Sequence, residues 1–276
     1  INTTPYDPNV DYALYEGNQV SLSDVGFDID QKFIGATWLD FFEQYLLPAV
    51  APSIEYNKVV DRIDYSGSQV VVHAGSETAM VDRVIVTVPV KCLQANSIQF
   101  VPDLPARQKN AIGDVTVWDG CKAFLAFSQK FYPTMVGFEI SPATAGQKLY
   151  YDAAYGQNTN QPVLGLFAVG TGTLPYVQLS PVDRLQYMLN ELDGLFNGQA
   201  SQYYLKHIFQ NWNAAPFAKG AYVYDHESSS TIRALGTALG ERVFFAGDAY
   251  TDGSDWSSVH AAIRSARSVI DTLVGG

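Results

Sequence analysis

Apolar positions change their period several times along this chain. From Thr37 they recur at helical spacing, and the pattern stops before Pro48 and Pro52, so it predicts one amphipathic helix. The apolar members of this stripe are Trp38, Phe41, Phe42, Tyr45 and Leu46. The first thirty residues are polar and turn-rich with little periodicity, which indicates an extended lead-in.

Short β-branched runs follow this helix, separated by turns such as Ser66-Gly67-Ser68. Runs of this kind are typical of strands, and here they predict a small sheet. The runs are residues 53–57, 59–63, 70–73 and 83–89. Because the last run is apolar in character, it indicates a strand buried on both faces.

The middle of the chain mixes both kinds of element. Residues 102–113 are expected to form a helix, and Ser180 followed by Pro181 indicates a second helix start, since Pro is favoured at the first helical position. That helix is expected to continue to Leu195 or Phe196. Strands are predicted at residues 122–127, 148–151 and 163–169. The fold class that follows is mixed α/β.

A strand, a turn and a helix close the chain. The apolar run at Phe244 leads through Gly247 and Asp248 to a helical pattern for which Ser257 or Ser258 is available as N-cap. The apolar stripe of this helix, expected to pack along its length, is Val259, Ala262, Ile263, Ala266, Ile270 and Leu273. A small-residue turn that carries a carboxylate beside a helix N-terminus can hold a polar cofactor against backbone amides.

Composition narrows the class of protein. Of 276 residues, 47% are hydrophobic and 16% charged, which is typical of a soluble globular protein. Seventeen basic against 28 acidic residues give a formal charge of −11, which disfavours nucleic acid and anionic membrane as partners. Cys92 and Cys121 are too few for a disulfide scaffold and have no zinc-ligand spacing. No apolar run reaches the roughly 18 residues of a membrane span, and no feature assigns a compartment.

Four separated stretches together resemble the flavin-dependent amine oxidase family, which contains monoamine, polyamine and L-amino-acid oxidases. They are residues 54–63, residues 84–89, Trp212 with Pro216 and residues 220–222, and residues 244–260. Their order and separation fit the family, and the resemblance covers roughly residues 37–276. It implies the C-terminal part of a two-domain FAD-dependent fold, with a flavin-domain remnant and a substrate domain built on a mixed sheet.

The resemblance also implies a division of the chain into functional domains. Residues 1–52 are then a lead-in segment and helix. Residues 53–98 and 240–276 form a discontinuous portion of the flavin-binding domain, and residues 99–239 form the substrate-binding domain.

Five residues match positions that hold the flavin in the family. Asp248, beside Gly247, matches a carboxylate near the ribityl and phosphate region. Ser258 and Val259 match the helix start that stabilises negative charge on the reduced ring. Val60 matches a position whose backbone contacts the adenine end. The alternative interpretations are a turn-forming or capping Asp248 and a plain core valine at Val60.

Lys122 matches the strand lysine that in many of these oxidases holds a water at flavin N5 and helps oxygen react. An edge lysine whose ammonium reaches solvent is the alternative. Trp212 and Tyr222 match aromatic residues near the flavin ring, where they form one wall of a substrate cage. At the opposite wall, Ser258 stands where an aromatic residue is frequent, and Trp256, two residues earlier, is the candidate replacement.

Family members begin with a Gly-rich strand-turn-helix that binds the ADP pyrophosphate, and this sequence contains none. We therefore expect FAD in the complete protein and weak or absent FAD binding by this chain alone. Either the chain is a fragment, or a separate N-terminal dinucleotide-binding chain supplies the other half, or FAD binding has been lost. The expected substrates are a small-molecule amine or amino acid and oxygen. A non-catalytic assembly subunit and a flavin desaturase or isomerase that does not use oxygen are the alternatives.

Overall fold

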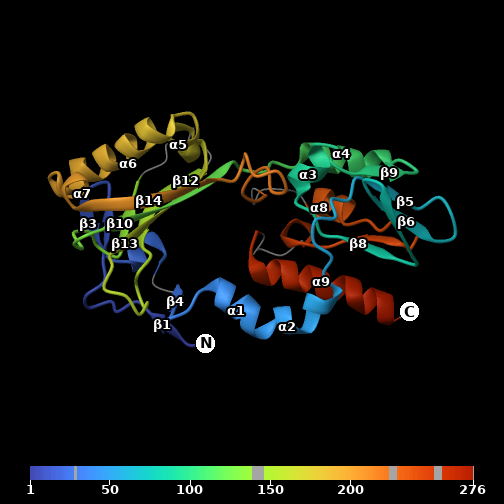
Figure 1. The fold of residues 1–276 in the computed structure, drawn as a ribbon, viewed down its shortest axis with the longest axis horizontal. Coiled ribbons are helices and arrows are strands. Elements are labelled where there is room, and N and C mark those ends of the chain that lie inside the picture. Colours follow the sequence, from blue (N-terminus) through green and yellow to red (C-terminus); the bar gives the residue numbers. More distant parts are fainter. Residues whose placement is uncertain (28–29, 139–145, 224–228, 252–256, 276) are drawn as a thin grey trace. The chain divides into compact units, whose positions relative to one another are not determined.

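The computed structural model describes residues 1–27, 30–138, 146–223, 229–251 and 257–275. The chain divides into two compact units (Figure 1). The first unit comprises residues 1–54 and 120–211, and the second comprises residues 55–119 and 212–276. These boundaries differ from those of the functional domains expected from the sequence, whose flavin-binding and substrate-binding roles stay a prediction.

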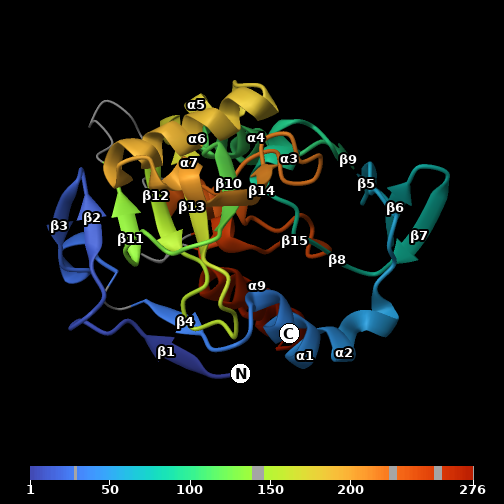
Figure 2. The same ribbon diagram turned by 60° about the vertical axis from the view of Figure 1, so that its left-hand side comes forward.

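The first unit is built on a seven-stranded mixed sheet with the strand order β14-β10-β13-β12-β11-β2-β3. Neighbouring strands are antiparallel except for β11 and β2, which run parallel. In this order the bounds are Tyr204–Asn211, Gly120–Phe127, Val163–Gly170, Gly146–Asp152, Met135–Gly137, Ala13–Tyr15 and Asn18–Val20. The strands predicted near residues 122, 148 and 163 are therefore confirmed as β10, β12 and β13, which lie side by side (Figure 2).

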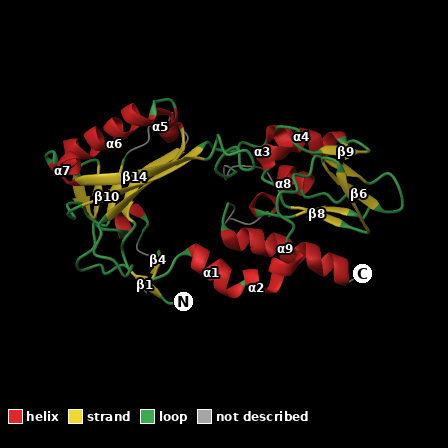
Figure 3. Cartoon of the chain, viewed as in Figure 1, coloured by secondary structure: helices red, strands yellow, loops and turns green. Residues whose placement is uncertain are grey.

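Helices cover one face of this sheet (Figure 3). They are α5 (Leu174–Val177), α6 (Pro181–Phe196) and α7 (Gln199–Tyr203). The predicted start of α6 is confirmed, because the Ser180 side chain accepts a hydrogen bond from the Asp183 N–H at 3.2 Å and Pro181 occupies the first turn. Leu125 and Leu166 of the sheet pack with Leu192 of α6 in one buried cluster. Alternate residues of the strands, Lys122 among them, consequently lie on the other face.

The prediction of an extended lead-in is wrong. Strands β2 and β3 extend the seven-stranded sheet, while β1 (Thr3–Pro5) pairs with β4 (Gln31–Phe33). A 3-10 helix, η1 (Ser23–Val25), lies between β3 and β4 in the sequence. These strands are three residues long, too short for a visible alternation of apolar and polar residues, and their pairing depends on partners distant in sequence.

The predicted amphipathic helix is present as α1 (Trp38–Tyr45), which begins with a capping box between Thr37 and Asp40. It ends before Pro48, as expected, but helical structure resumes in α2 (Leu47–Val50) and η2 (Ala51–Ser53). It can resume because Pro48 lies in the first turn of α2, where its missing N–H costs no hydrogen bond.

The second unit contains a four-stranded sheet of order β7-β6-β5-β9 and a parallel pair, β15 and β8. Their bounds are Glu77–Val81, Val70–Ala74, Arg62–Asp64, Gln99–Val101, Val243–Phe245 and Val84–Val86. The helices of this unit, including one 3-10 helix, are α3 (Val90–Gln94), α4 (Ala106–Asp114), α8 (Ser229–Leu235), η4 (Asp248–Tyr250) and α9 (Val259–Val274). Phe100, Ile112 and Phe245 belong to its common core.

Three predictions for residues 53–89 need correction. No strand forms at residues 53–57, because η2 ends at Ser53 and Asn57 has a φ of 60°, which breaks an extended backbone. The next predicted strand starts later than expected, at Arg62. In β8, Val86 is buried but Val84 and Ile85 are only half-buried.

The helix α9 begins where the sequence predicted, but its apolar stripe does not pack along its length. Ala261 and Ser265 are its buried residues, whereas Val259, Ile263 and Ile270 are each close to half exposed. Small side chains at Ala261 and Ser265 bring the helix close to the turn that precedes it, and the larger apolar residues project elsewhere. No helix within the described ranges has the length and hydropathy to cross a membrane.

Candidate functional site

The turn at Gly247 is the centre of the site predicted in the second unit. It follows the fully buried strand β15 and precedes η4. Gly247 has a φ of 153°, a backbone conformation that other residues rarely adopt, so the turn favours glycine. The Gly247 N–H donates to Ser265 Oγ at 3.2 Å. This hydrogen bond joins the turn to helix α9.

Asp248 lies directly after this glycine and is substantially buried. Burial raises the pKa of its carboxyl above the usual range, and its own main-chain N–H and that of Ala249 partly offset the rise. Nearby, Tyr250 OH and Thr251 Oγ1 are buried and have no hydrogen-bond partner within the described chain. Buried polar atoms without partners are costly, and polar groups of a bound ligand would satisfy them.

The start of α9 leaves a main-chain donor open. Ser258 is the N-cap, and its hydroxyl accepts from the Ala261 N–H at 3.2 Å. The Val259 N–H has no partner among the described residues. The first N–H groups of a helix carry partial positive charge, so Val259 offers a donor to an anionic group, and its role toward a flavin stays a prediction.

A hydrogen bond connects the segment that carries Tyr222 to the residues just before α9. Ser257, with a φ of 59°, donates from its hydroxyl to the Val223 carbonyl at 2.6 Å. The Tyr222 carbonyl accepts from the Trp118 N–H at 2.9 Å, and the two rings lie 5.8 Å apart between centroids. The structure thus brings Tyr222 and the residues before α9 together. It also adds Trp118, which had no sequence signal beyond being aromatic.

The other predicted residues of this unit are less connected. Trp212 is 41% exposed, and its carbonyl accepts from the Ala215 N–H at 3.2 Å. The Val60 side chain packs against the core, while its main-chain N–H and C=O have no partner within the described chain. Trp256 lies outside the described residues. The binding roles of all three stay predictions.

Lys122 lies on the open face of the sheet in the first unit. In β10 it pairs with Phe167 on one side and Gln210 on the other. Its Nζ is 5.4 Å from the centroid of the Phe167 ring, and burial lowers the pKa of the ammonium group. No carboxylate forms an ion pair with it in the described chain. A half-buried lysine without a counter-ion is costly for a purely structural role.

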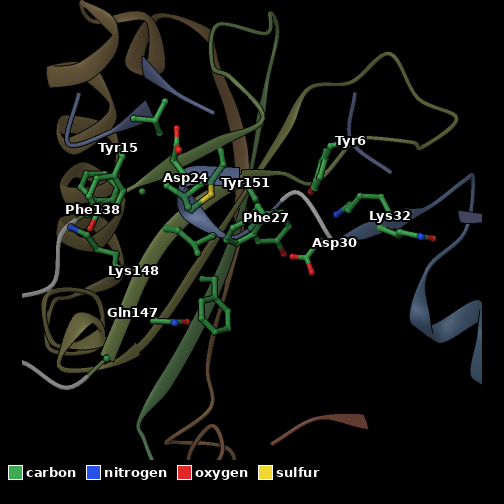
Figure 4. A pocket seen from close by; sticks show the side chains of 18 of the residues that line it. Tyr6, Tyr15, Asp24, Phe27, Asp30, Lys32, Phe138, Gln147, Lys148 and Tyr151 are labelled. Atoms are coloured by element: carbon green, nitrogen blue, oxygen red, sulfur yellow. The ribbon is translucent and has the colours of Figure 1, made fainter. Parts of the chain in front are cut away.

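A cavity of about 1060 Å³ opens on the same face of this sheet (Figure 4). Its aromatic walls are Tyr6, Tyr15, Phe27, Trp38, Phe138, Tyr151 and Phe167. Phe167 therefore borders both the cavity and Lys122. The volume suits a small organic ligand. Sequence reasoning missed this cavity because five of the seven rings come from outside the predicted strands.

Glycines in the strands let tyrosine rings lie flat on the cavity floor. A Cβ at Gly165 would approach the Tyr151 ring to 2.6 Å, and one at Gly137 would approach the Tyr15 ring to 2.7 Å. Each tyrosine thus covers a glycine of the neighbouring strand. The floor is an aromatic surface whose shape depends on glycine, which has no side chain, at both of these positions.

Comparison with known proteins shows which family the chain belongs to. The family model for flavin-containing amine oxidoreductases matches residues 44–271. The chain belongs to the flavin-containing amine oxidoreductase family. This confirms the resemblance and the flavin cofactor that it implied.

Curated members of this family are longer than this chain. Over 221 residues it is 28% identical to Lysine-specific histone demethylase 1 homolog 1 of Oryza sativa subsp. japonica, covering 77% of this chain and 26% of that protein. Over 226 residues it is 28% identical to Polyamine oxidase 4 of the same organism, covering 79% of this chain and 44% of that protein. The chain thus spans less than half of either relative.

Solved structures show the same fold. A redesigned putrescine oxidase matches with a TM-score of 0.75 at 18% identity, over 92% of this chain and 56% of that one. Cyclohexylamine oxidase from Brevibacterium oxydans IH-35A matches with a TM-score of 0.65 at 20% identity, over 82% and 51%. The α/β class with a mixed sheet, predicted from the sequence, is confirmed.

The residues of the second unit fit a flavin. The open N–H at Val259 suits the electron-rich side of the ring, and Thr251 Oγ1 needs a polar partner. Asp248 can accept hydrogen bonds from the hydroxyls of a ribityl chain. These residues can hold the ring and its ribityl arm, while the sequence lacks a Gly-rich fingerprint for the pyrophosphate.

Proposed function

We propose that the complete protein is an FAD-dependent oxidoreductase that oxidises an amine or amino acid by hydride transfer to flavin, with oxygen as the acceptor. The observation that carries the proposal is the connected arrangement at the start of α9. There, the Gly247 N–H donates a hydrogen bond to the Ser265 hydroxyl, and the Ser257 hydroxyl donates one to the carbonyl of Val223, the residue after Tyr222. Family membership supplies the flavin.

When bound, FAD supplies the acceptor for the hydride that leaves the amine-bearing carbon. The chain's own residues would bind the flavin and orient the amine. The Val259 N–H would donate to the anionic side of the ring, and Asp248 would anchor the ribityl hydroxyls. Tyr222 and Trp118 form an aromatic wall that attracts an amine and excludes water.

Lys122 is the residue to which we assign the oxygen half-reaction. Its Nζ has no acceptor in the described chain and its pKa is lowered, so it can hold a water and exchange a proton with it. The alternative, that Lys122 extends to solvent from an edge strand, finds no support in the topology. Strand β10 is an inner strand, paired with β13 and β14.

An amine as substrate is supported by the relatives. Polyamine oxidases and a putrescine oxidase bound to putrescine are named among the similar proteins. The aromatic pair of Trp118 and Tyr222 agrees with this, because rings attract ammonium groups without reacting with them.

The test uses the complete protein loaded with FAD and mixed with a panel of amines and amino acids without oxygen. Bleaching of the flavin absorbance, followed by peroxide formation when oxygen is admitted, is the expected result. Bleaching without peroxide would indicate a desaturase or isomerase. A complete protein that neither retains flavin nor is reduced would contradict the proposal and indicate an assembly subunit.

A further inference from the structure

Lys32 is a second lysine on the open face of the first unit's sheet, and it lines the cavity. Its Nζ is 5.0 Å from the centroid of the Tyr151 ring. No hydrogen bond or ion pair to its ammonium group exists within the described chain. Burial lowers its pKa and the charge of Lys122 adds to this, while the charges of Asp152 and Asp30 partly offset the fall. A ring stabilises an ammonium only in part, so the Lys32 ammonium lacks a direct acceptor within the described chain.

The carboxylates around Lys32 favour its charged form, but none of them forms an ion pair with it in the described chain. Asp152 forms an ion pair with Lys130 at 2.7 Å. Asp24 accepts hydrogen bonds from the Ser21 N–H and hydroxyl, and Asp30 is exposed. Figure 4 shows Asp30 and Lys32 on the same side of the cavity. An exposed carboxylate is well solvated and needs no partner, whereas a half-buried ammonium does. An anion bound in the cavity would supply the direct partner that Lys32 lacks.

The backbone holds Lys32 in place. Strand β4, which carries it, pairs with β1 so that Lys32 lies opposite Thr4. The Gln157 side chain donates to the Phe33 carbonyl at 2.8 Å, and the Gly35 N–H donates to the Gly156 carbonyl at 2.8 Å. Lys32 is thus fixed from both sides, which gives a binding group a defined position.

Lys32 and Lys122 lie over rings on neighbouring strands. Tyr151 belongs to β12 and Phe167 to β13, and both rings line the cavity. An anion placed near Lys32 would lie at one side of an aromatic surface that ends near Lys122. The rest of the same ligand, if apolar or aromatic, can cover that surface toward the residue assigned to oxygen chemistry.

We propose that Lys32 binds the carboxylate of an amino acid with an apolar or aromatic side chain, so that the substrate is a zwitterion and not a simple amine. This assignment rests on the proposed function for its chemistry, but the binding site is argued from this cavity itself. Lys32 then determines specificity, because an amine without a carboxylate would leave its charge uncompensated.

The test is calorimetric titration of the full chain with three matched ligands, without added flavin. L-Phenylalanine carries both charges, phenethylamine lacks the carboxylate, and 3-phenylpropionate lacks the amine. Phenylalanine should bind about tenfold or more tighter than phenethylamine, as expected for one charged hydrogen bond. Lys32→Met should abolish that preference and weaken 3-phenylpropionate, Lys32→Arg should retain it, and the matched control Lys206→Met, an exposed lysine of β14, should change nothing.

Several results would overturn this assignment. They are tighter binding of phenethylamine or 1,4-diaminobutane than of phenylalanine, no measurable phenylalanine binding to the folded chain, and an unchanged preference in Lys32→Met. The more conservative Lys32→Gln serves if Lys32→Met does not fold, as judged by circular dichroism. Because binding is read without flavin, a failure of the oxidase proposal, in which no substrate reduces FAD, is a separate outcome.

Discussion

The hydroxyl of Ser257 donates a hydrogen bond to the main-chain carbonyl of Val223 at 2.6 Å, across 34 residues of sequence. It ties the turn before α9 to the segment that carries Tyr222. The predicted flavin-binding helix start and the predicted aromatic wall therefore share one support. Disturbing that support should affect both.

Ser257→Ala should lower the stability of the chain by about 1 kcal/mol, the usual net value of one such hydrogen bond. The melting temperature should fall by about 2–4 °C for a protein of this size. In the complete protein, FAD affinity should fall as well, because the start of α9 is held less firmly. Differential scanning calorimetry and flavin titration measure the two effects. Ser268→Ala, an exposed serine on the same helix, is the control, and an equal response in both variants would contradict the link.

Glu191 is the centre of a buried polar network in the first unit. It forms an ion pair with Lys148 and accepts hydrogen bonds from Tyr150 OH at 2.9 Å and Tyr176 OH at 2.8 Å. The Lys148 and Glu191 side chains are 17% and 12% exposed. Glu191→Ala leaves the lysine charge buried without its partner and should cost about 3–5 kcal/mol, measured by urea unfolding.

The double variant Glu191→Leu with Lys148→Met removes both charges and should be more stable than Glu191→Ala. If the single and double variants unfold at the same urea concentration, the ion pair is not what the network depends on.

Lys122→Met in the complete, FAD-loaded protein should slow flavin reoxidation by oxygen by about a hundredfold, at the lower end of what a positioned proton donor contributes. The anaerobic reduction rate should change much less, because Lys122 is not assigned to the hydride step. Stopped-flow absorbance separates the two half-reactions. Unchanged oxygen kinetics would remove Lys122 from the mechanism, and Lys206→Met provides the baseline.

Asp248→Asn should stabilise the apo chain at neutral pH while weakening FAD binding. Burial raises the folded-state pKa of Asp248 above its ordinary 3.8, so between these two values the folded chain binds more protons than the unfolded chain. Stability consequently falls as pH rises through that window, and at neutral pH the ionised carboxylate costs stability.

The advantage of Asp248→Asn should therefore shrink as pH is lowered below 3.8. Thermal melts of both proteins across the acidic range measure it. A gain in stability that is constant with pH would show that the carboxyl charge is not its cause.

This chain by itself should bind FAD weakly or not at all. The residues at Gly247 and α9 are those that we propose to hold the ring and ribityl arm, and the sequence has no Gly-rich strand-turn-helix for the pyrophosphate. Purified without added flavin, the chain should show no flavin absorbance, and titration with FAD should give little change in flavin fluorescence. Stoichiometric flavin in the purified chain would contradict this.

Elements with strong local signals could be predicted from the sequence. Helix α6 starts at Pro181 after the Ser180 cap, and α9 starts after Ser258, because caps and proline act within a few residues. The apolar stripe of α9 was predicted to pack and does not, since periodicity shows which residues share a face but not what covers it. The strand expected at residues 53–57 does not form because Asn57 has a φ of 60°, a local conformation that Asn tolerates and that the apolar pattern does not signal.

The sequence by itself determined the family, the turn at Gly247 and Asp248, the helix start at Val259 and the strand that carries Lys122. Only the tertiary structure decided what lies beside them. It placed Ser257 against Val223, Lys32 over Tyr151 and Lys122 over Phe167. These contacts join segments far apart in the chain, and they arise from strand pairing and the close approach that glycines such as Gly165 permit. Local periodicity carries no record of such pairings, because it repeats over a few residues while they span tens to more than a hundred.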